Sequence, residues 1–450
     1  MRIFSSIRVA CWALLPMILA GGFAQGATLQ TLYPAATPLS GLVSASDGNF
    51  YGTSRYGGSN DLGTVFKLSP AGVYQVIHSF AGTADGANPC AALAMGPDGL
   101  LYGTCQYGGA QNAGTVFKIA TSGSFSLLAS LVSFIQGAEP VGGLVVGPDN
   151  ALYGTTSSGG LHGFGNVFQI STNGSYAILY NFSGTDGKSP AATLISGTDG
   201  LLYGTTKFGG TNDCGTVFKI TTAGTFSSLF SFNATNGYMP GALVQGSDNA
   251  FYGTTAYGGS SGFGSIFKVT PVGTFTSLHS MVLENLGSNP LAGLVFGADG
   301  NLYGSANYGG GNGFGSVFQA TASGGFSSLW DFSGNSDGAN PFATLVFGGN
   351  YHFYGTTSLG GTGGGGTFYE LTTLHFDTIQ ILAGGQNVNY AGAGGTSNAQ
   401  YTVLTATNLT IPRTNWIFAG VGQFDAAGRF SFTNAVNRQE ASRYFLLSQP

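Results

Sequence analysis

The sequence has few charged residues, cysteines and tryptophans. Only 7% of its 450 residues are charged, and the chain contains four cysteines and three tryptophans. Disordered chains are typically rich in charge and poor in hydrophobic side chains, so the hydrophobic content of 43% indicates a folded protein. Glycine contributes 78 residues and aromatics 13%, which is typical of a chain with many turns around an apolar core.

Basic residues are scarce enough to argue against a nucleic-acid partner. The formal net charge is −5, and without the two arginines of the first 26 residues the chain has 11 basic residues against 18 acidic ones. Binding to a phosphate backbone needs clustered lysine and arginine side chains. We therefore expect no nucleic-acid partner.

Residues 1–26 have the pattern of a secretory signal peptide. Arg2 and Arg8 form a charged start, an apolar run extends from Val9 to Ala20, and Ala24-Gln25-Gly26 is a small-x-small cleavage motif. An apolar run of this length is too short to span a bilayer. The pattern predicts a secreted, extracellular or cell-surface protein.

Two further observations argue against a membrane anchor after the signal is removed. Cys11 has Arg8 three positions earlier, where a lipoprotein signal has leucine, so we expect release rather than lipid anchoring. The chain also ends without a long apolar tail, so we expect no transmembrane anchor.

Three cysteines follow the signal peptide, namely Cys90, Cys105 and Cys214. If Asp98-Gly99 forms a two-residue hairpin turn, Ala92 lies opposite Cys105, and Cys90 lies diagonally from Cys105 on the same face. A disulfide between Cys90 and Cys105 and a pair of free thiols are both open on this evidence. Cys214 has no evident partner in the sequence.

The phrase Tyr-Gly-Thr/Ser-x-x-x-Gly-Gly occurs seven times. Its copies begin at Tyr51, Tyr102, Tyr153, Tyr203, Tyr252, Tyr303 and Tyr354, with gaps of 49 to 51 residues. In every copy the apolar pair of a following strand begins 14 residues after the tyrosine, as in Val65-Phe66 and Val217-Phe218. A constant period of this length is typical of a repeat architecture built from one supersecondary unit.

Each repeat divides into four short segments with strand character. The first is apolar, and in the first six repeats it ends in Asp-Gly or Asp-Asn, a pair that favours tight hairpin turns. The second carries the Tyr-Gly-Thr phrase, the third reads Val-Phe-Lys-Ile, and the fourth alternates apolar positions, as in Phe226 to Phe232. No segment after residue 26 has a convincing helical period, so we predict an all-β fold.

Seven four-stranded units of about 50 residues predict a seven-bladed β-propeller. A β-solenoid is the alternative, but about 50 residues is long for one coil, and the Gly-Asp calcium nonapeptides are missing. Residues Thr28 to Tyr33 resemble a fourth strand, whereas the last unit stops after its third strand, Thr367 to Leu371. We therefore predict that the N-terminal strand completes the last blade and closes the ring, which removes two exposed edges.

Residues 376–450 follow a different pattern. Alternating segments such as Gln400 to Asn408 and Arg429 to Thr433 are separated by Gly, Asn and Pro. This pattern predicts a small β-sandwich. The predicted organisation is a signal peptide at 1–26, a seven-repeat β-propeller at 27–375 and a C-terminal β-sandwich-like domain at 376–450.

The repeat resembles the tandem repeat of the GloVer family of exported bacterial proteins. The resemblance is carried by residues 201–220, Leu-Leu-Tyr-Gly-Thr-Thr-x-x-Gly-Gly-x-x-x-x-Gly-Thr-Val-Phe-Lys-Ile, and it extends from residue 28 to about 375. It implies export but no particular activity. The tail, with Tyr401 and Trp416, is similar to the accessory β domains that end many such proteins. The sixth copy departs from the pattern in having Ser305 for threonine, and the last lacks the Asp-Gly turn.

The end of the propeller that carries the Gly-Gly loops is the predicted binding face. It also carries the longer segments between blades, and function tends to reside on loops presented by a rigid scaffold. The residue before Gly-Gly is aromatic in five of seven copies, Tyr56, Tyr107, Phe208, Tyr257 and Tyr308, and is Ser158 or Leu359 in the others. Two interpretations are open. The rings stack on sugars with polar help from Arg55, Gln106, His162 and Lys207, or they pack between the blades.

Three functions fit this architecture. The first is a binding or interaction scaffold whose partner is a polysaccharide or a surface protein. The second is a carbohydrate-active hydrolase or lyase, which two or more acidic residues at the mouth of the central channel would favour. The third is a structural surface-layer component, which self-association of the protein would favour.

The sequence identifies no catalytic residue, metal site or cofactor. The five histidines, His78, His162, His279, His352 and His375, show no zinc spacing and no nucleophile-base pair. The loops between blades contain Asp85, Glu139, Asp186 and Asp337. Each of these loops offers one carboxylate, whereas calcium needs several oxygen ligands. We expect no cofactor, with calcium left open as the alternative.

Overall fold

The computed structural model describes residues 27–34, 40–282, 287–349, 351–373, 375–381, 387–395, 398–406, 417–435 and 444–448. This part of the chain is all-β apart from one four-residue helix, α2 (Ser133–Gln136). The signal peptide predicted at 1–26 lies outside the described residues, as does Trp416. The chain divides into two compact units, and residues 30–348 with 353–370 make up the larger one.

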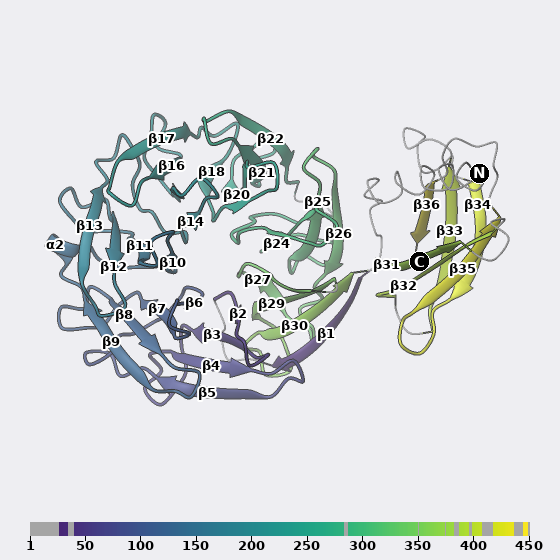
Figure 1. Cartoon of the computed structure of the whole chain (residues 1–450), viewed down its shortest axis with the longest axis horizontal. Helices are drawn as coiled ribbons and strands as arrows, with labels where there is room; N and C mark the ends of the chain where they lie inside the picture. The colour runs from purple at the N-terminus through teal and green to yellow at the C-terminus, as the bar shows by residue number, and fades with distance from the viewer. Residues whose placement is uncertain are drawn as a thin grey trace, which may run out of the picture. The chain divides into compact units, whose positions relative to one another are not determined.

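Seven antiparallel sheets form a ring of blades, with the first strand of each repeat nearest the centre and the fourth outside (Figure 1). The first strands are β2 (Val43–Ser44), β6 (Ala94–Met95), β10 (Val145–Val146), β14 (Ile195–Ser196), β19 (Val244–Gln245), β23 (Val295–Phe296) and β28 (Val346–Gly349). The second strands are β3 (Phe50–Ser54), β7 (Leu101–Cys105), β11 (Leu152–Thr156), β15 (Leu202–Thr206), β20 (Phe251–Tyr257), β24 (Leu302–Ala306) and β29 (His352–Leu359). The seven-bladed prediction is confirmed.

The two outer strands of each blade are longer than the first. The third strands are β4 (Thr64–Leu68), β8 (Thr115–Ile119), β12 (Asn166–Ile170), β16 (Thr216–Ile220), β21 (Ser265–Val269), β25 (Ser316–Ala320) and β30 (Thr367–Thr373). The fourth strands of blades one to six are β5 (Tyr74–Ser79), β9 (Phe125–Ser130), β13 (Tyr176–Asn181), β17 (Phe226–Ser231), β22 (Phe275–Ser280) and β26 (Phe326–Asp331). Two short strands, β18 (Tyr238–Pro240) and β27 (Ala339–Pro341), pair with the ends of β20 and β29.

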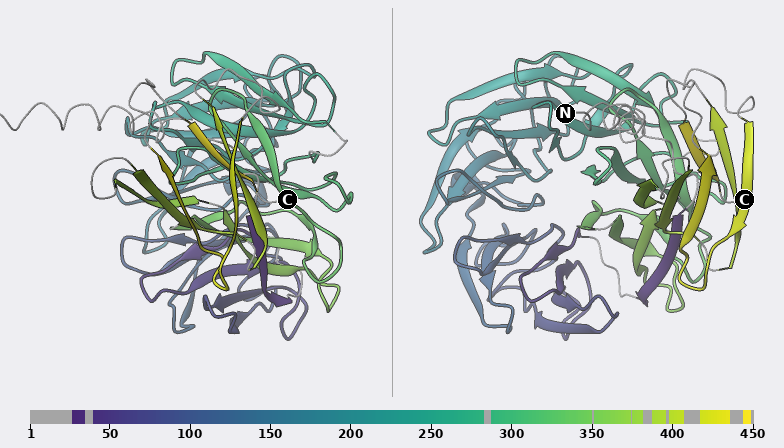
Figure 2. Two further views of the ribbon diagram at one scale, coloured as in Figure 1. Left: turned by 90° about the vertical axis from the view of Figure 1, so that its right-hand side faces the viewer. Right: turned by 45° about the vertical axis from the view of Figure 1, so that its right-hand side comes forward.

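The N-terminal strand closes the ring, as predicted. Strand β1 (Ala27–Pro34) pairs with β30 and takes the outer place in the seventh blade, where it is drawn in purple beside the green strands (Figures 1 and 2). The ring of Tyr33 stacks on that of Tyr74 in the first blade, with centroids 4.8 Å apart and planes 8° apart. The first and last parts of the propeller are therefore joined by both a strand pair and an aromatic contact.

Each residue of the Tyr-Gly-Thr phrase has its own structural role. In the fourth blade, the buried Tyr203 donates from its phenol to Asp199 at 2.6 Å. A Cβ atom on Gly204 would lie 2.6 Å from the ring of Phe218, so glycine is needed for this ring to cross the strand. The Thr205 hydroxyl donates to the carbonyl of Gly241 in the next blade at 2.9 Å. The phrase thus secures the hairpin turn, the sheet face and the contact between blades.

The tyrosine-aspartate bond recurs in six blades. Its members are Tyr51-Asp47, Tyr102-Asp98, Tyr153-Asp149, Tyr203-Asp199, Tyr252-Asp248 and Tyr303-Asp299, at 2.6 to 2.8 Å. Each of these aspartates also accepts from the backbone two residues later, as Asp199 Oδ1 does from the N–H of Leu201. The aspartates therefore shape the turns and also satisfy buried phenols.

The first hairpin turn is one residue longer than predicted. Ala94 pairs with Tyr102, and Gly96 donates its N–H to the carbonyl of Leu100, so the loop has three residues. The prediction that Ala92 lies opposite Cys105 is therefore wrong by one position. Gly99 has a φ of 76°, which is the left-handed residue that a three-residue hairpin loop requires. Cys90, Cys105 and Cys214 are free thiols, so the disulfide alternative is also wrong.

The second unit contains two three-stranded sheets. One has the order β31 (His375–Ile381), β32 (Asn387–Ala393), β35 (Phe430–Ala435), and the other has the order β34 (Ile417–Gln423), β33 (Gln400–Ala406), β36 (Tyr444–Ser448). Tyr401, Val403, Phe424 and Phe430 form one buried cluster between them. The Tyr401 phenol donates to the carbonyl of Ser431 at 3.0 Å. This is the sandwich predicted for the tail, and its first strand begins at His375.

Candidate functional site

The two ends of the propeller differ in how much chain they carry. One end has the tight turns between first and second strands and between third and fourth strands, such as residues 45–49 and 69–73. The other end, here called the loop end, has the Gly-Gly loops and the segments that cross from an outer strand to the next inner strand, such as residues 55–63 and 80–93. The longest segments therefore gather at the end where binding was predicted.

The aromatic position before Gly-Gly is exposed in one continuous part of the ring. Tyr257, Tyr308 and Leu359 in blades five, six and seven are 44%, 51% and 53% exposed. Tyr56 in blade one, which follows blade seven in the closed ring, is 44% exposed. We call these four residues the exposed arc. Packing between blades does not bury these side chains.

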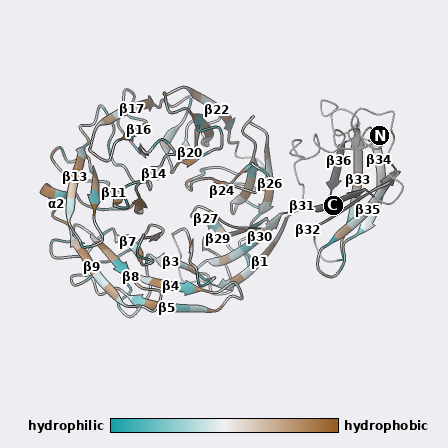
Figure 3. Ribbon diagram, in the orientation of Figure 1, coloured by the Kyte–Doolittle hydropathy of each residue, from teal (hydrophilic) through white to brown (hydrophobic). Residues whose placement is uncertain are grey.

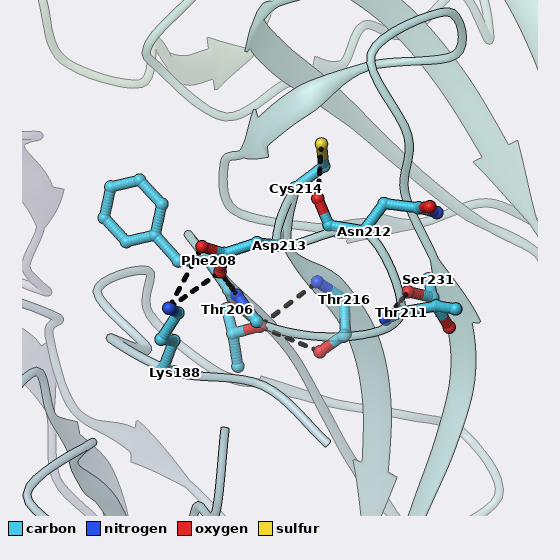
Figure 4. Close-up of polar contacts among 10 residues, drawn as sticks. Lys188, Thr206, Phe208, Thr211, Asn212, Asp213, Cys214, Thr216 and Ser231 are labelled. Atoms are coloured by element: carbon cyan, nitrogen blue, oxygen red, sulfur yellow. Dashed lines mark hydrogen bonds and ion pairs between the residues drawn. The ribbon is translucent and has the colours of Figure 1, made fainter. Parts of the chain in front are cut away.

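The same position is half-buried in blades two and four. The Tyr107 phenol accepts a hydrogen bond from Gln106 Nε2 at 3.0 Å. The Phe208 ring lies 5.9 Å from that of Tyr238, and Figure 4 shows it near Lys188, which forms an ion pair with Asp213 at 2.9 Å. The structure therefore places Tyr107 and Phe208 in local packing and leaves the exposed arc to the other blades.

The residue before the aromatic position varies more than any other residue of the phrase. Along the chain it is Arg55, Gln106, Ser157, Lys207, Ala256, Asn307 and Ser358. Arg55 Nη2 donates to Gln106 Oε1 at 2.8 Å, and Gln106 Nε2 donates to Glu139 Oε2 at 3.1 Å. Ser158 Oγ donates to the other oxygen of Glu139 at 3.4 Å. A series of side-chain hydrogen bonds therefore links the first three blades.

Cys90 and Lys207 belong to the same group. Cys90 Sγ lies 3.8 Å from the carbonyl oxygen of Val141, which holds the equivalent place in the next blade. Burial raises the pKa of the Cys90 thiol, and the charges of Arg55, Lys207 and Glu139 all act on this sulfur. Burial also lowers the pKa of Lys207. Arg55, Gln106 and Lys207 occupy one repeat position at the loop end, just after the second strands of blades one, two and four. We call these three residues, with Cys90 and Glu139 from the segments that cross to the inner strands, the axial cluster.

Glu139 occupies an unusual backbone position. Its φ is 56°, in the left-handed region, as are those of the equivalent Asn88, Ser189, Met239, Asn289 and Asn340. Each of these asparagines donates from Nδ2 at 3.0 Å to a carbonyl at the Arg55 position of the preceding blade. A glutamate cannot make that donation when ionised, and its carboxylate instead accepts from Gln106 and Ser158. Sequence reasoning assigned Glu139 no role beyond a calcium alternative, although its departure from the asparagine pattern was visible.

The remaining predicted site residue, His162, lies apart from both groups. It is exposed on the loop between β11 and β12. Among the described residues, none of the recorded side-chain contacts joins His162 to the axial cluster or the exposed arc. On the same rim, helix α2 exposes Phe134 and Ile135 and is drawn brown in Figure 3.

The acidic residues of the crossing segments have local partners. Asp85 Oδ2 lies 2.9 Å from His78 Nε2, and Asp337 accepts from Trp330 Nε1 at 3.3 Å. Asp186 accepts from the phenol of Tyr180. At the three repeat positions of the axial cluster, the described residues include one carboxylate, that of Glu139, whereas a hydrolase was expected to need two. No group of three His, Cys, Asp or Glu side chains suited to a metal occurs in the described ranges.

A sequence model of the Gloeobacter/Verrucomicrobia repeat matches residues 20–213 and 193–411, which together span most of the chain. The chain belongs to the Gloeobacter/Verrucomicrobia repeat family. The resemblance carried by residues 201–220 is thereby confirmed. No curated protein matches this member of the Gloeobacter/Verrucomicrobia repeat family in sequence. In the part of the chain that the structure describes, no helix has the length and apolar character needed to cross a membrane.

Solved structures share the fold of this Gloeobacter/Verrucomicrobia repeat chain at low identity. The BP39L lectin from Burkholderia pseudomallei is 12% identical, with a TM-score of 0.53 over 78% of this chain and 97% of the lectin. The extracellular domain of the hybrid two-component system BT3049 from B. thetaiotaomicron is 9% identical, with a TM-score of 0.52 over 93% of this chain and 57% of that one. The gluconolactonase XC5397 from Xanthomonas campestris is 14% identical, with a TM-score of 0.41 over 76% and 99%. At these identities the similarity concerns the fold alone.

Proposed function

We propose that this chain is an exported binding propeller whose loop end recognises carbohydrate. The observation that carries the proposal is the exposed arc, in which Tyr56, Tyr257 and Tyr308 present their rings at one repeat position and at one end of the scaffold. Tyrosine faces suit stacking on sugar rings, while their hydroxyls stay in water. Contiguous exposed apolar patches mark interaction sites, and the four residues of the exposed arc come from adjacent blades.

Polar groups beside the exposed arc complement the rings. The Arg55 guanidinium carbon lies 5.8 Å from the ring centre of Tyr56, so a cation stands directly next to the arc. Ser358, before Leu359, is partly exposed, and its hydroxyl donates to the carbonyl of Asn340 at 2.9 Å and can still accept a hydrogen bond from a ligand. Sugar binding sites combine apolar faces with a few placed polar groups, which is the combination found at this end.

Two further observations support the proposal. The signal-peptide pattern of residues 1–26 favours export, where polysaccharides and surface proteins are available as partners. The propeller of BP39L, which is a lectin, has the same fold, so the fold is compatible with a lectin function.

The test is a glycan array with purified residues 27–450 and two variants. The triple variant Y56A/Y257A/Y308A removes the rings of the exposed arc, whereas V73A/V272A removes two apolar side chains, 67% and 84% exposed, from turns at the opposite end. Each aromatic contact contributes about 0.5 to 1.5 kcal/mol, so we expect the triple variant to bind at least about tenfold more weakly. The control should bind as the parent does.

Three outcomes would contradict the proposal. The first is an array on which the parent protein binds no glycan. The second is a triple variant that keeps its thermal unfolding temperature and binds the same glycans as strongly as the parent. A triple variant that loses thermal stability without losing binding would likewise assign these rings to packing.

A further inference from the structure

The two cations of the axial cluster lack the partners that the other cations of the propeller have. Among its described basic residues, Lys67, Lys188 and Lys268 form ion pairs with aspartates at 3.0, 2.9 and 2.8 Å. Lys118 and Lys219 donate from Nζ to backbone carbonyls at 2.9 and 3.0 Å. Arg55 and Lys207 are the other two, and neither has a carboxylate partner in this part of the chain.

The donor groups of Arg55 and Lys207 are largely unused. Arg55 makes one recorded side-chain hydrogen bond, to Gln106 Oε1, although a guanidinium has five N–H donors. Its Nε is buried and has no partner among the described residues. Lys207 is partly buried, and its ammonium makes no hydrogen bond or ion pair with a side chain among the described residues. Partly desolvated cations of this kind are costly unless an anion compensates them.

The carboxylate of Glu139 does not serve as that anion. Gln106 stands between Arg55 and Glu139 and bonds to both, while Ser158 takes the second carboxylate oxygen. No ion pair joins Glu139 to Arg55 or Lys207 among the described residues. The cluster therefore keeps two unpaired positive charges beside one carboxylate that is already occupied.

We infer that the axial cluster binds the carboxylate of an acidic saccharide, with Arg55 and Lys207 as its charge partners. The inference rests on the proposed function, since Tyr56 of the exposed arc lies beside Arg55 and would hold the sugar ring. The planar guanidinium fits a carboxylate in bidentate geometry, and the ammonium adds a compact second charge. The whole chain has a net charge of −5, so polyanions have no general attraction to it and recognition must be local.

The experiment compares oligogalacturonate, oligoalginate and hyaluronan oligosaccharides with the carboxyl-reduced form of each, in equilibrium titrations of residues 27–450. We expect the parent to prefer at least one acidic form over its reduced form by about tenfold or more, because hydrogen bonds to charged groups are the strong ones. Added salt should weaken the binding, since screening acts on partly exposed charges.

R55Q/K207Q removes two positive charges from the loop end. Its matched control, K118Q/K219Q, removes two positive charges from lysines that bond to turns at the opposite end. R55Q/K207Q should lose the preference for the acidic form, and K118Q/K219Q should keep it. Thermal unfolding shows whether each variant folds, and the single variants R55Q and K207Q replace the double variant if it does not. Each single variant should lower the preference severalfold.

Several results would overturn the inference. Equal binding of acidic and reduced forms, or an unchanged preference in folded R55Q/K207Q, would remove the carboxylate from the site. Equal binding of a sulfated galactan oligosaccharide would mean a general anion site instead of a carboxylate site. If neutral glycans bind and only Y56A/Y257A/Y308A abolishes binding, this inference fails while the proposed function stands. If no glycan binds at all, both fail.

Discussion

At the residue scale, Glu139 stands at a left-handed position that holds asparagine in three other repeats and Ser189 or Met239 in two. A left-handed backbone costs an ordinary residue about 1 to 2 kcal/mol, and asparagine tolerates it better than glutamate. Asn88, Asn289 and Asn340 also donate to a neighbouring carbonyl, which Glu139 does not. The glutamate therefore gives up stability at a position beside Arg55 and Gln106, which is expected where a residue serves binding.

Replacing Glu139 with asparagine should raise stability. We expect E139N to add about 1 kcal/mol to the free energy of unfolding, because asparagine fits the left-handed position and can repeat the carbonyl bond of its siblings. The measurement is chemical denaturation followed by tryptophan fluorescence. E139Q is the control, since it keeps the strained backbone and should gain little. A lower free energy of unfolding for E139N than for the parent would contradict this account of the position.

The residue scale is also where sequence reasoning was least complete. The Gly-Gly phrase, Arg55 and Lys207 were visible as candidates, and the loop end was the predicted face. The sequence did not show which of the aromatic side chains would be exposed, because residues of one type at one repeat position differ only in their neighbours. Two of them, Tyr107 and Phe208, are half-buried, whereas Tyr56, Tyr257 and Tyr308 are exposed. Cys90 and Glu139 were not recognised as part of the cluster, since their contacts with Val141 and with Gln106 depend on how neighbouring blades pack.

At the element scale, strand β1 is the piece that joins the two ends of the propeller. It pairs with β30, stacks Tyr33 on Tyr74, and bonds from Thr31 to the carbonyl of Ser336 at 3.1 Å. Without it the last blade would expose the edge of β30, and exposed edges are templates for pairing with other chains. Closure by β1 was predictable because the missing fourth strand and the extra N-terminal strand have the same pattern.

Removing β1 should destabilise the propeller and promote association. We expect a chain that begins at residue 35 to unfold at a temperature lower by several degrees, in line with the loss of a few kcal/mol of strand pairing. It should also elute at a larger size than the 27–450 chain in size-exclusion chromatography with light scattering. A synthetic peptide of residues 27–34 should restore both properties, and a scrambled peptide should not. Unchanged melting and elution would refute the role assigned to β1.

Turn length was the part of the element scale that sequence reasoning missed. The Asp-Gly pairs signalled hairpins, but the loop has three residues rather than two, with glycine as the left-handed third residue. Both turn types favour the same residues, so the pair alone does not fix the register. The error displaced the expected partner of Cys105 by one position and made a disulfide look geometrically reasonable.

At the scale of the whole molecule, the buried tyrosines make stability depend on alkaline pH. The pKa values of Tyr102, Tyr153 and Tyr203 are raised far above the ordinary value of 10, mainly because the phenols are buried and secondly because each donates a hydrogen bond to an aspartate. Burial and Glu370 raise the pKa of Tyr354 to about 12. Because these pKa values are raised in the folded state, their contribution to stability is complete below pH 10 and falls as pH rises above it.

We therefore expect the free energy of unfolding to be constant between about pH 8 and pH 9.5 and to fall steeply above pH 10. Urea denaturation at a series of pH values measures this, with tyrosinate absorbance recorded in parallel. The buried tyrosines should ionise together with unfolding, after the exposed ones. Independent titration of every tyrosine near pH 10 in a protein that stays folded would contradict the account.

The proposed function depends on carbohydrate binding by the exposed arc at the loop end. Its most direct test is isothermal titration of one oligosaccharide, the strongest binder on the array, into the parent, Y56A/Y257A/Y308A and V73A/V272A at equal concentrations. The account predicts saturable heat for the parent and the turn-end control, with affinities within about twofold, and at least about tenfold weaker binding for the triple variant. Equal affinity of all three proteins, each shown to be folded, would contradict it.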